Sequence, residues 1–180
     1  MPAKKSSSFF IRGTVSVPSS GGFTQTQIDL SSYVSALGKS IVRIKSIEGE
    51  WTQGPNGDNP GFAPFMDADK AGAAVWQLTT QSNSGLVSLD DRTTIGKGQI
   101  WARNPDSGAG GNAPAMVYND SHLPQHYSEG FLCAVEDIYL AGQSSPDWVD
   151  TTDLTFNIVL ECEVLTMGQS EAMALSLSQQ

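Results

Sequence analysis

The stretch Leu154-Thr-Phe-Asn-Ile-Val-Leu-Glu-Cys-Glu-Val-Leu165 decides the fold of this chain. Every even-numbered residue from Leu154 to Val164 is apolar, whereas polar residues (Asn157, Glu161 and Glu163) fall in the other phase. Alternation with a period of two is typical of a strand with one buried face, because successive side chains point to opposite sides of a sheet. The stretch therefore predicts a half-buried antiparallel strand about 40 Å long.

The rest of the chain contains further short segments with strand-like composition. In the third of them the apolar residues change phase between Ile44 and Ile47, which predicts a β-bulge near Lys45–Ser46. The second is polar and suits a sheet edge or an outer face. The additional strands are expected over 9–17, 23–28, 41–51, 73–81, 86–89, 99–103, 115–118 and 131–140.

One short helix is expected after the second strand. Asp29 or Ser31 can cap its first turn with a side-chain oxygen, and Gly38 stands where a left-handed C-cap belongs. We expect about two turns that cover one end of the fold. The apolar residues at helical spacing are Leu30, Tyr33, Val34 and Leu37.

Turn-forming residues are frequent, with 18 glycines and 9 prolines, and they gather in loops over 52–64, 104–114 and 143–153. The sequence contains no repeat of 20–50 residues and no regular alternation of strands with helices, so solenoids, propellers and parallel α/β sheets are disfavoured. The fold expected is an all-β, antiparallel, eight-stranded jelly-roll sandwich with one short helix and long loops. We divide it into a flexible N-terminal segment (1–8), a jelly-roll domain (9–165) and a C-terminal arm (166–180).

The charge balance argues against several partners. Ten lysines and arginines stand against 19 acidic residues, the net charge is −9, and no basic block exceeds Lys4-Lys5, so direct binding of nucleic acid is not expected. No apolar run approaches the roughly 20 residues of a membrane span. The apolar run Phe9–Ile11 is too short for a secretory signal, so we expect synthesis in the cytosol without a cleaved leader.

Few residues suggest chemistry. His122 and His126 are four apart, but Pro124 between them argues against a helical metal site. Asp67 and Asp69 open like a calcium loop whose twelfth position is a leucine, so an EF-hand is excluded, although a weaker calcium site between loops stays open. Asp90-Asp91 fits a solvated turn. We expect no catalytic residues, no cofactor and no metal ligand.

Two residue types leave alternatives open. Cys133 and Cys162 both lie in apolar strands and are expected to be buried thiols, with a bridge between neighbouring strands as the alternative. The tryptophans are expected to pack in or at the rim of the core, although a sugar-binding module would expose such rings for stacking. They are Trp51, Trp76, Trp101 and Trp148.

The layout over 9–165 resembles that of small single-jelly-roll capsid (coat) proteins of viruses. The similarity lies in a short lysine-bearing head, an opening strand, a polar run that leads into a long strand, and a long closing strand followed by a tail. These segments are Pro2–Ser8, Ile11–Val17, Ile28–Val34 with Ile41–Ile47, and Leu154–Leu165. Many such proteins carry a long arginine-rich arm that neutralises the genome, whereas this chain has only Lys4 and Lys5 at its start. In a shell built from it, another protein, a membrane or counterions would face the nucleic acid.

The resemblance implies a structural virion protein, a self-assembling capsid shell subunit without enzymatic activity or cofactor. Its partners would be copies of itself and other virion proteins. It would be located in the virion, which would be assembled in the host cytoplasm. Two alternatives remain: a non-catalytic carbohydrate-binding or adhesin-type β-sandwich module, and an enzyme of cupin-like type, for which two histidines are few.

The tail after the closing strand carries three large apolar residues, Met173, Leu175 and Leu177. They alternate as an added strand would, although Ser170 can equally cap a short helix. Because apolar side chains at a free terminus are unfavourable in water, we expect them to contact a neighbouring subunit, with a frayed end as the alternative.

Overall fold

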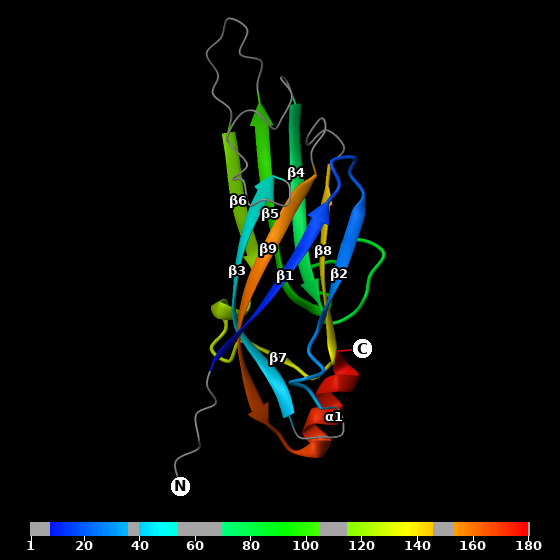
Figure 1. The fold of residues 1–180 in the computed structure, drawn as a ribbon, viewed down its shortest axis with the longest axis vertical. Coiled ribbons are helices and arrows are strands. Elements are labelled where there is room, and N and C mark those ends of the chain that lie inside the picture. The colour runs from blue at the N-terminus through cyan, green and yellow to red at the C-terminus, as the bar shows by residue number, and fades with distance from the viewer. Residues whose placement is uncertain (1–7, 36–39, 54–69, 105–114, 146–152, 180) are drawn as a thin grey trace, which may run out of the picture.

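The computed structural model describes residues 8–35, 40–53, 70–104, 115–145 and 153–179, which form two antiparallel sheets packed face to face (Figure 1). The elements in chain order are β1 (Phe9–Val17), β2 (Phe23–Asp29), β3 (Ser40–Gln53), β4 (Lys70–Thr79), β5 (Thr94–Asn104), β6 (Ala115–His122), the 3-10 helix η1 (Pro124–His126), β7 (Phe131–Cys133), β8 (Asp137–Ser144), β9 (Leu154–Thr166) and α1 (Gln169–Ser178).

The strand order identifies a jelly roll. One sheet has the order β1-β9-β3-β7 and the other the order β2-β8-β4-β5-β6. The pairs β1 with β9, β2 with β8, β3 with β7 and β4 with β5 are nested, as if one long antiparallel hairpin were rolled up on itself. The eight-stranded jelly roll expected from the sequence is confirmed, with β6 as an additional strand at the edge of the five-stranded sheet.

Strand β9 lies in the middle of the four-stranded sheet and supplies the centre of the core. Phe156, Ile158 and Leu160 are buried, and the odd-numbered residues between them are partly exposed on the outer face. The Phe156 ring stacks on Trp76 at 4.8 Å between ring centroids and meets Trp51 at the same distance, tilted by 48°. The strand phase predicted from the alternation is therefore confirmed.

The predicted bulge is also present. The register of β3 against β9 shifts between Ile44 and Ser46, so that apolar residues before and after the shift both reach the core. Gly130 has a positive φ of 64° and lies against the backbone of Ile44, where any Cβ would collide with the Ile44 carbonyl oxygen. The backbone at Gly130 therefore packs against the bulge of β3.

The predicted helix over 30–37 is wrong for the part that the structure describes. The Asp29 carboxylate accepts a hydrogen bond from the Ser31 N–H at 2.7 Å, but only one turn follows. The Ser35 N–H bonds to the Ser40 carbonyl and so turns the chain toward β3. Leu37 and Gly38 lie outside the described residues. The one α-helix in the described residues is α1, in the C-terminal segment.

Two predicted strands need correction. The segment 131–140 is two strands, β7 in one sheet and β8 in the other, because the chain crosses between the sheets at Ala134–Glu136. The segment 86–89 is a loop: the buried Gln77 amide accepts from the Val87 N–H at 2.9 Å and donates to the Gly85 carbonyl at 3.2 Å. Hydrogen bonds from the Gln77 side chain, and not the backbone of a neighbouring strand, hold this segment.

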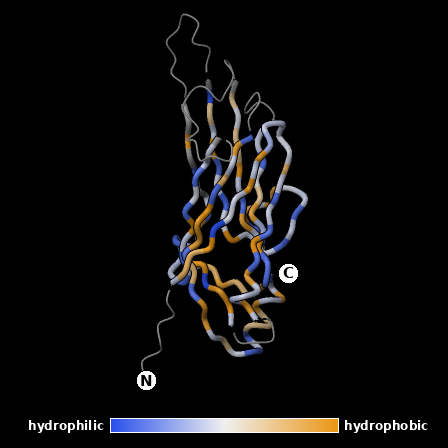
Figure 2. Tube along the Cα trace, in the orientation of Figure 1, coloured by the Kyte–Doolittle hydropathy of each residue, from blue (hydrophilic) through white to orange (hydrophobic). Residues whose placement is uncertain are grey.

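Hydrophobic residues follow the facing sides of the two sheets and the end at which α1 packs (Figure 2). The main core fills the space between the sheets. A second, smaller cluster combines Ile41, Ala134 and Ala172 with partly buried neighbours from the chain around α1. Within the described ranges, no helix is both long and apolar enough to cross a membrane.

Candidate interaction surfaces

The two histidines lie beside the end of β6. His122 Nδ1 is 3.0 Å from the Tyr127 hydroxyl oxygen, and the two rings are tilted at 5.3 Å between centroids. Burial holds the pKa of His122 below its usual range, and the nearby His126 lowers it further. Among the residues described, no three histidine, cysteine or acidic side chains gather as metal ligands. The structure therefore gives His122 a packing role against Tyr127.

The acidic pairs noted in the sequence do not form a catalytic centre in the described chain. Asp91 Oδ1 accepts hydrogen bonds from the Thr93 N–H at 2.8 Å and the Thr93 hydroxyl at 2.6 Å, and these bonds lower its pKa. Asp90 is exposed in the same turn, as expected. Asp67 and Asp69 lie outside the described residues.

The cysteines are buried, free thiols, and the alternative of a bridge is wrong. Cys133 pairs across from Val42 and Cys162 across from Ile44, so β3 runs between them. Strands two apart in a sheet are about 9–10 Å from each other, beyond the roughly 7 Å that a disulfide spans between Cα atoms. Burial raises the pKa of Cys133 to about 11 and that of Cys162 to about 12.

Among the described tryptophans, Trp51 and Trp76 are buried, whereas Trp101 is 42% exposed on the outer face of the five-stranded sheet. Trp148 lies outside the described residues. Trp101 pairs directly with Val117, which is 52% exposed on the edge strand β6. Two amide side chains, Gln99 and Asn119, form the next exposed pair on this face, and the exposed Arg103 follows Trp101 on β5. We call Trp101, Arg103 and Val117 the Trp101 patch.

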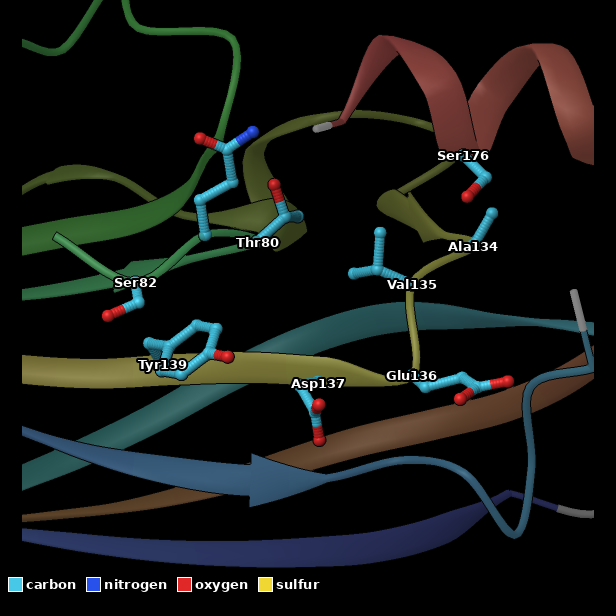
Figure 3. Close-up of a pocket in the computed structure, with 9 residues that line it drawn as sticks. Thr80, Ser82, Ala134, Val135, Glu136, Asp137, Tyr139 and Ser176 are labelled. Carbon is cyan, nitrogen blue, oxygen red and sulfur yellow. The ribbon is translucent and has the colours of Figure 1, made fainter.

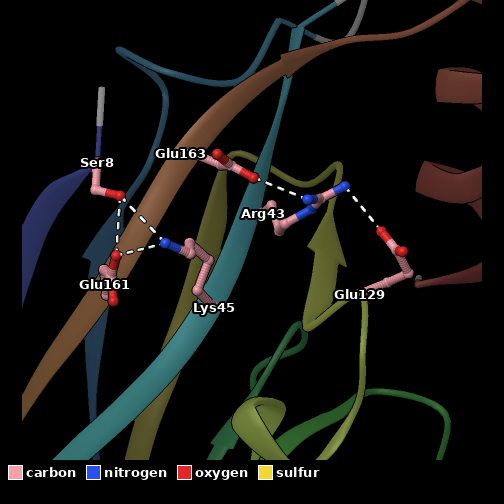
Figure 4. Close-up of polar contacts among 6 residues, drawn as sticks. All are labelled: Ser8, Arg43, Lys45, Glu129, Glu161 and Glu163. Carbon is pink, nitrogen blue, oxygen red and sulfur yellow. Dashed lines mark hydrogen bonds and ion pairs between the residues drawn. The ribbon is translucent and has the colours of Figure 1, made fainter. Parts of the chain in front are cut away.

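The outer face of the four-stranded sheet carries a set of ion pairs (Figure 4). Lys45 Nζ is 2.6 Å from Glu161 Oε1, which also accepts from the Ser8 hydroxyl at 2.9 Å. The hydrogen bond between Lys45 and Glu161 raises the pKa of Lys45 and lowers the pKa of Glu161. Arg43 reaches two carboxylates, Glu163 at 2.9 Å and Glu129 at 3.0 Å. These contacts join β1, β3, β9 and the segment before β7.

Further along the same face, toward the end of β3, lies an open hollow of about 350 Å³. Glu48 and Glu50 project into it from β3, because residues two apart share a face of a strand. Asn157 and Val159 of β9 complete its described lining, together with Gly49. The ion pairs found among the described residues do not include either glutamate. We call this site the acidic hollow.

A pocket of about 550 Å³ lies where α1, the loop after β4 and the β7–β8 connection meet (Figure 3). Its described lining contains both polar and apolar side chains. Asp137 is held by the Gln27 amide at 2.7 Å. The lining residues are Thr80, Gln81, Ser82, Ala134, Val135, Glu136, Asp137, Tyr139 and Ser176.

The tail folds as helix α1 against its own domain. Ala172 is buried, and Leu175 is half-buried against the second hydrophobic cluster. The buried Gln179 anchors the end of the helix: its side-chain oxygen accepts from the Ala134 N–H at 2.9 Å. Met173 and Leu177, one helical turn apart, remain 47% and 67% exposed. Two of the three residues predicted as subunit contacts are therefore available to a partner in this structure.

The sequence did not reveal the acidic hollow or the exposure of Arg103 beside Trp101. The pattern Glu48-Gly-Glu50 on the outer phase of a predicted strand was a signal for two neighbouring carboxylates. What the strand pattern cannot show is the register with β9, which brings Asn157 opposite Glu50 and Val159 opposite Glu48.

Comparison with known proteins gives distant structural neighbours only. No family model matches the chain, and no curated protein does. Solved structures that it resembles include VP1 of Trichodysplasia spinulosa-associated polyomavirus in complex with GM1 oligosaccharide, at 10% identity over 92% of this chain and 97% of that chain, with a TM-score of 0.39. An unassembled pentamer of Merkel cell polyomavirus VP1 matches at 8% identity over 92% and 98%, with a TM-score of 0.40. Desmodium yellow mottle tymovirus matches at 15% identity over 92% and 93%, with a TM-score of 0.28. The jelly-roll fold of this chain rests on its own nested strand pairs.

Proposed function

We propose that this chain is a structural virion protein, a self-assembling subunit of a capsid shell. The observation that carries the proposal is the exposure of large apolar side chains on the outside of a sandwich whose core is already complete. Trp101 and Val117 lie on one sheet, and Met173 and Leu177 on α1. Neighbouring apolar side chains left in water mark surfaces that other proteins cover.

The charge of the chain supports contacts with protein more than contacts with nucleic acid. The net charge is −9, and two of the described basic side chains, Arg43 and Lys45, are already paired with glutamates. Copies of the same chain and other virion proteins are the partners proposed, in a virion assembled in the host cytoplasm. Asp91 serves a turn, Glu161 and Glu163 form ion pairs, and His122 packs against Tyr127, which supports the proposal of a role without enzymatic activity.

Helix α1 supplies one proposed subunit contact. Leu175 and Gln179 fix the helix on its own domain, which leaves Met173 and Leu177 to meet a neighbouring copy. Deletion of the tail would also remove Ala172 from the second cluster, so point substitutions separate assembly from folding more cleanly. Met173→Ser with Leu177→Ser should keep the melting temperature of the parent chain and weaken its assembly.

The test of the proposed function is the state of the purified chain. Sedimentation velocity over a concentration series, followed by electron microscopy, should show pentamers, hexamers or closed particles. A single 19.1 kDa species at every concentration and salt tested would overturn the proposal. Exposed Ser84→Ala, in the loop after β4, is the matched control for the α1 variant and should assemble as the parent does.

A carbohydrate-binding module is the second candidate, and one observation favours it. Trp101 is exposed on a sheet face beside the amides of Gln99 and Asn119, and an aromatic ring with neighbouring hydrogen-bonding groups suits a sugar ring. A monomer that binds immobilised glycans, and loses this binding with Trp101→Ala, would support this candidate over a shell subunit.

A further inference from the structure

The Trp101 patch and the acidic hollow lie on opposite outer faces of the sandwich, near the same end. Strands β5 and β3 both point toward that end in Figure 1, with Trp101 and Glu50 close to their last residues. The side chains between these faces belong to the buried core, so the two surfaces cannot meet within one chain.

We infer that the Trp101 patch of one copy docks into the acidic hollow of the next copy. The inference rests on the proposed function, because it specifies which surfaces of a shell subunit meet. The occupant of the hollow is a second copy of this chain.

Charge complementarity supports this pairing. The hollow presents the carboxylates of Glu48 and Glu50 without a described ion-pair partner, and the patch presents the exposed guanidinium of Arg103. Arginine binds carboxylates through charge-assisted, often bidentate, hydrogen bonds. Arg12 on β1 lies beyond Val159 at the rim of the hollow, and the two carboxylates outnumber it.

Shape and hydrophobicity support it as well. Trp101 is exposed on a sheet face, and the residue that pairs with it on β4 is Ala73. Because the alanine side chain is small, it covers little of the indole on that side. The hollow has a half-buried apolar wall at Val159. Tryptophan and arginine are the residues that most often dominate the binding energy of an interface, especially where a pocket receives them.

The use of two different surfaces determines the symmetry. A contact between unlike patches is heterologous, so each copy offers one patch and one hollow and the contacts continue from copy to copy. Such a contact gives a ring where the rotation between copies closes and an open filament where it does not, and it does not give an isolated two-fold dimer. A ring is the outcome that the proposed shell function requires.

Charge reversal tests the contact directly. Arg103→Glu alone and Glu48→Lys with Glu50→Lys alone should each raise the concentration needed for assembly at least tenfold in sedimentation velocity. The chain with all three substitutions should recover most of the assembly, because the reversed charges again attract. Glu136→Lys, an exposed reversal outside both surfaces, is the matched control and should assemble as the parent chain does.

A second measurement does not depend on the stability of the reversed variants. Val117→Cys and Val159→Cys, present in one chain, should give a ladder of disulfide-linked oligomers when oxidised with copper phenanthroline, while either substitution alone should not. The native Cys133 and Cys162 are buried and should stay unreacted.

The outcomes separate the two levels of the proposal. If the parent assembles but Arg103→Glu and Trp101→Ala assemble equally well, and no ladder forms, the docking inference is wrong and the shell function stands. If Trp101→Ala loses only binding to glycans, the patch is a sugar site instead. A parent chain that stays monomeric throughout overturns both the function and the inference.

Discussion

The side-chain amide of Gln125 pairs with the backbone of Ile47 as a neighbouring strand would. Its oxygen accepts from the Ile47 N–H at 3.0 Å, and its nitrogen donates to the Ile47 carbonyl at 3.0 Å. Ile47 stands just after the bulge of β3, where η1 replaces a strand as the neighbour on that side.

Gln125→Ala should therefore destabilise the fold by about 1–3 kcal/mol, because it leaves a partly buried N–H and carbonyl of β3 without partners. Chemical denaturation monitored by tryptophan fluorescence measures the change. Gln99→Ala, which truncates an exposed glutamine, is the control and should stay within about 0.5 kcal/mol of the parent. Equal stability of both variants would contradict the role assigned to Gln125.

Adjacent positions of β9 should respond very differently to truncation. Ile158 is 2% exposed between the sheets, so Ile158→Ala should cost about 2–5 kcal/mol through lost burial and a residual cavity. Val159 points to the outer face, and Val159→Ala should cost distinctly less. Urea unfolding of the two variants checks the strand phase, and a cost below about 1 kcal/mol for Ile158→Ala would mean that the phase is wrong.

Gly49 leaves room for the ring of Phe156. A Cβ at this position would overlap the Phe156 ring, which is already enclosed by Trp51 and Trp76. Gly49→Ala should thus destabilise the protein by about 1–3 kcal/mol through overpacking. Gly85→Ala, where no neighbouring atom lies within contact distance of an added methyl group, should be nearly neutral. Thermal melts of the pair provide the comparison.

The thiols should be inert in the native protein. With pKa values raised to about 11 and about 12, Cys133 and Cys162 stay protonated near neutral pH, and only the thiolate attacks a disulfide reagent. Ellman's reagent should release almost no colour at pH 8 until denaturant is added, after which both thiols react. Rapid reaction of the folded chain would contradict their burial.

Acid should weaken the turn at Asp91. Its pKa is lowered in the folded state by hydrogen bonds from Thr93, so its contribution to stability is present above the unfolded value near 3.8 and is lost as pH falls through the folded value. Asp91→Asn should be less stable than the parent at pH 7, and the difference should shrink toward pH 2. Ser84→Ala, at an exposed position without a titrating side chain, is the control and should show no such trend.

Strands with one buried face could be predicted because their side chains alternate. The residue ranges of β1 and β9, and the bulge of β3, follow from this alternation alone. The segment 131–140 is apolar except for Glu136 and Asp137 and has no such period, so its pattern did not predict the crossing between sheets at Ala134–Glu136. The helix expected after Asp29 ends after one turn because the Ser35 N–H bonds to the Ser40 carbonyl and not to a carbonyl four residues before it.

The interaction surfaces could be predicted in part. Apolar residues in the tail predicted a subunit contact, which stays a prediction. The packed helix leaves Met173 and Leu177 exposed and shows that Leu175 faces its own domain. The acidic hollow depends on the register between β3 and β9, and the Trp101 patch on that between β5 and β6. Long-range pairing of this kind leaves no trace in one sequence.

The position of β9 between β1 and β3 imposes an order on folding during synthesis. Phe9 pairs with Cys162, so the first strand has no partner in its sheet until β9 has left the ribosome. Such long loop closures make folding slow and leave strand edges open to aggregation in the meantime. A chain whose β9 has not yet emerged therefore lacks the finished four-stranded sheet, and under the proposed function it is not yet competent for assembly.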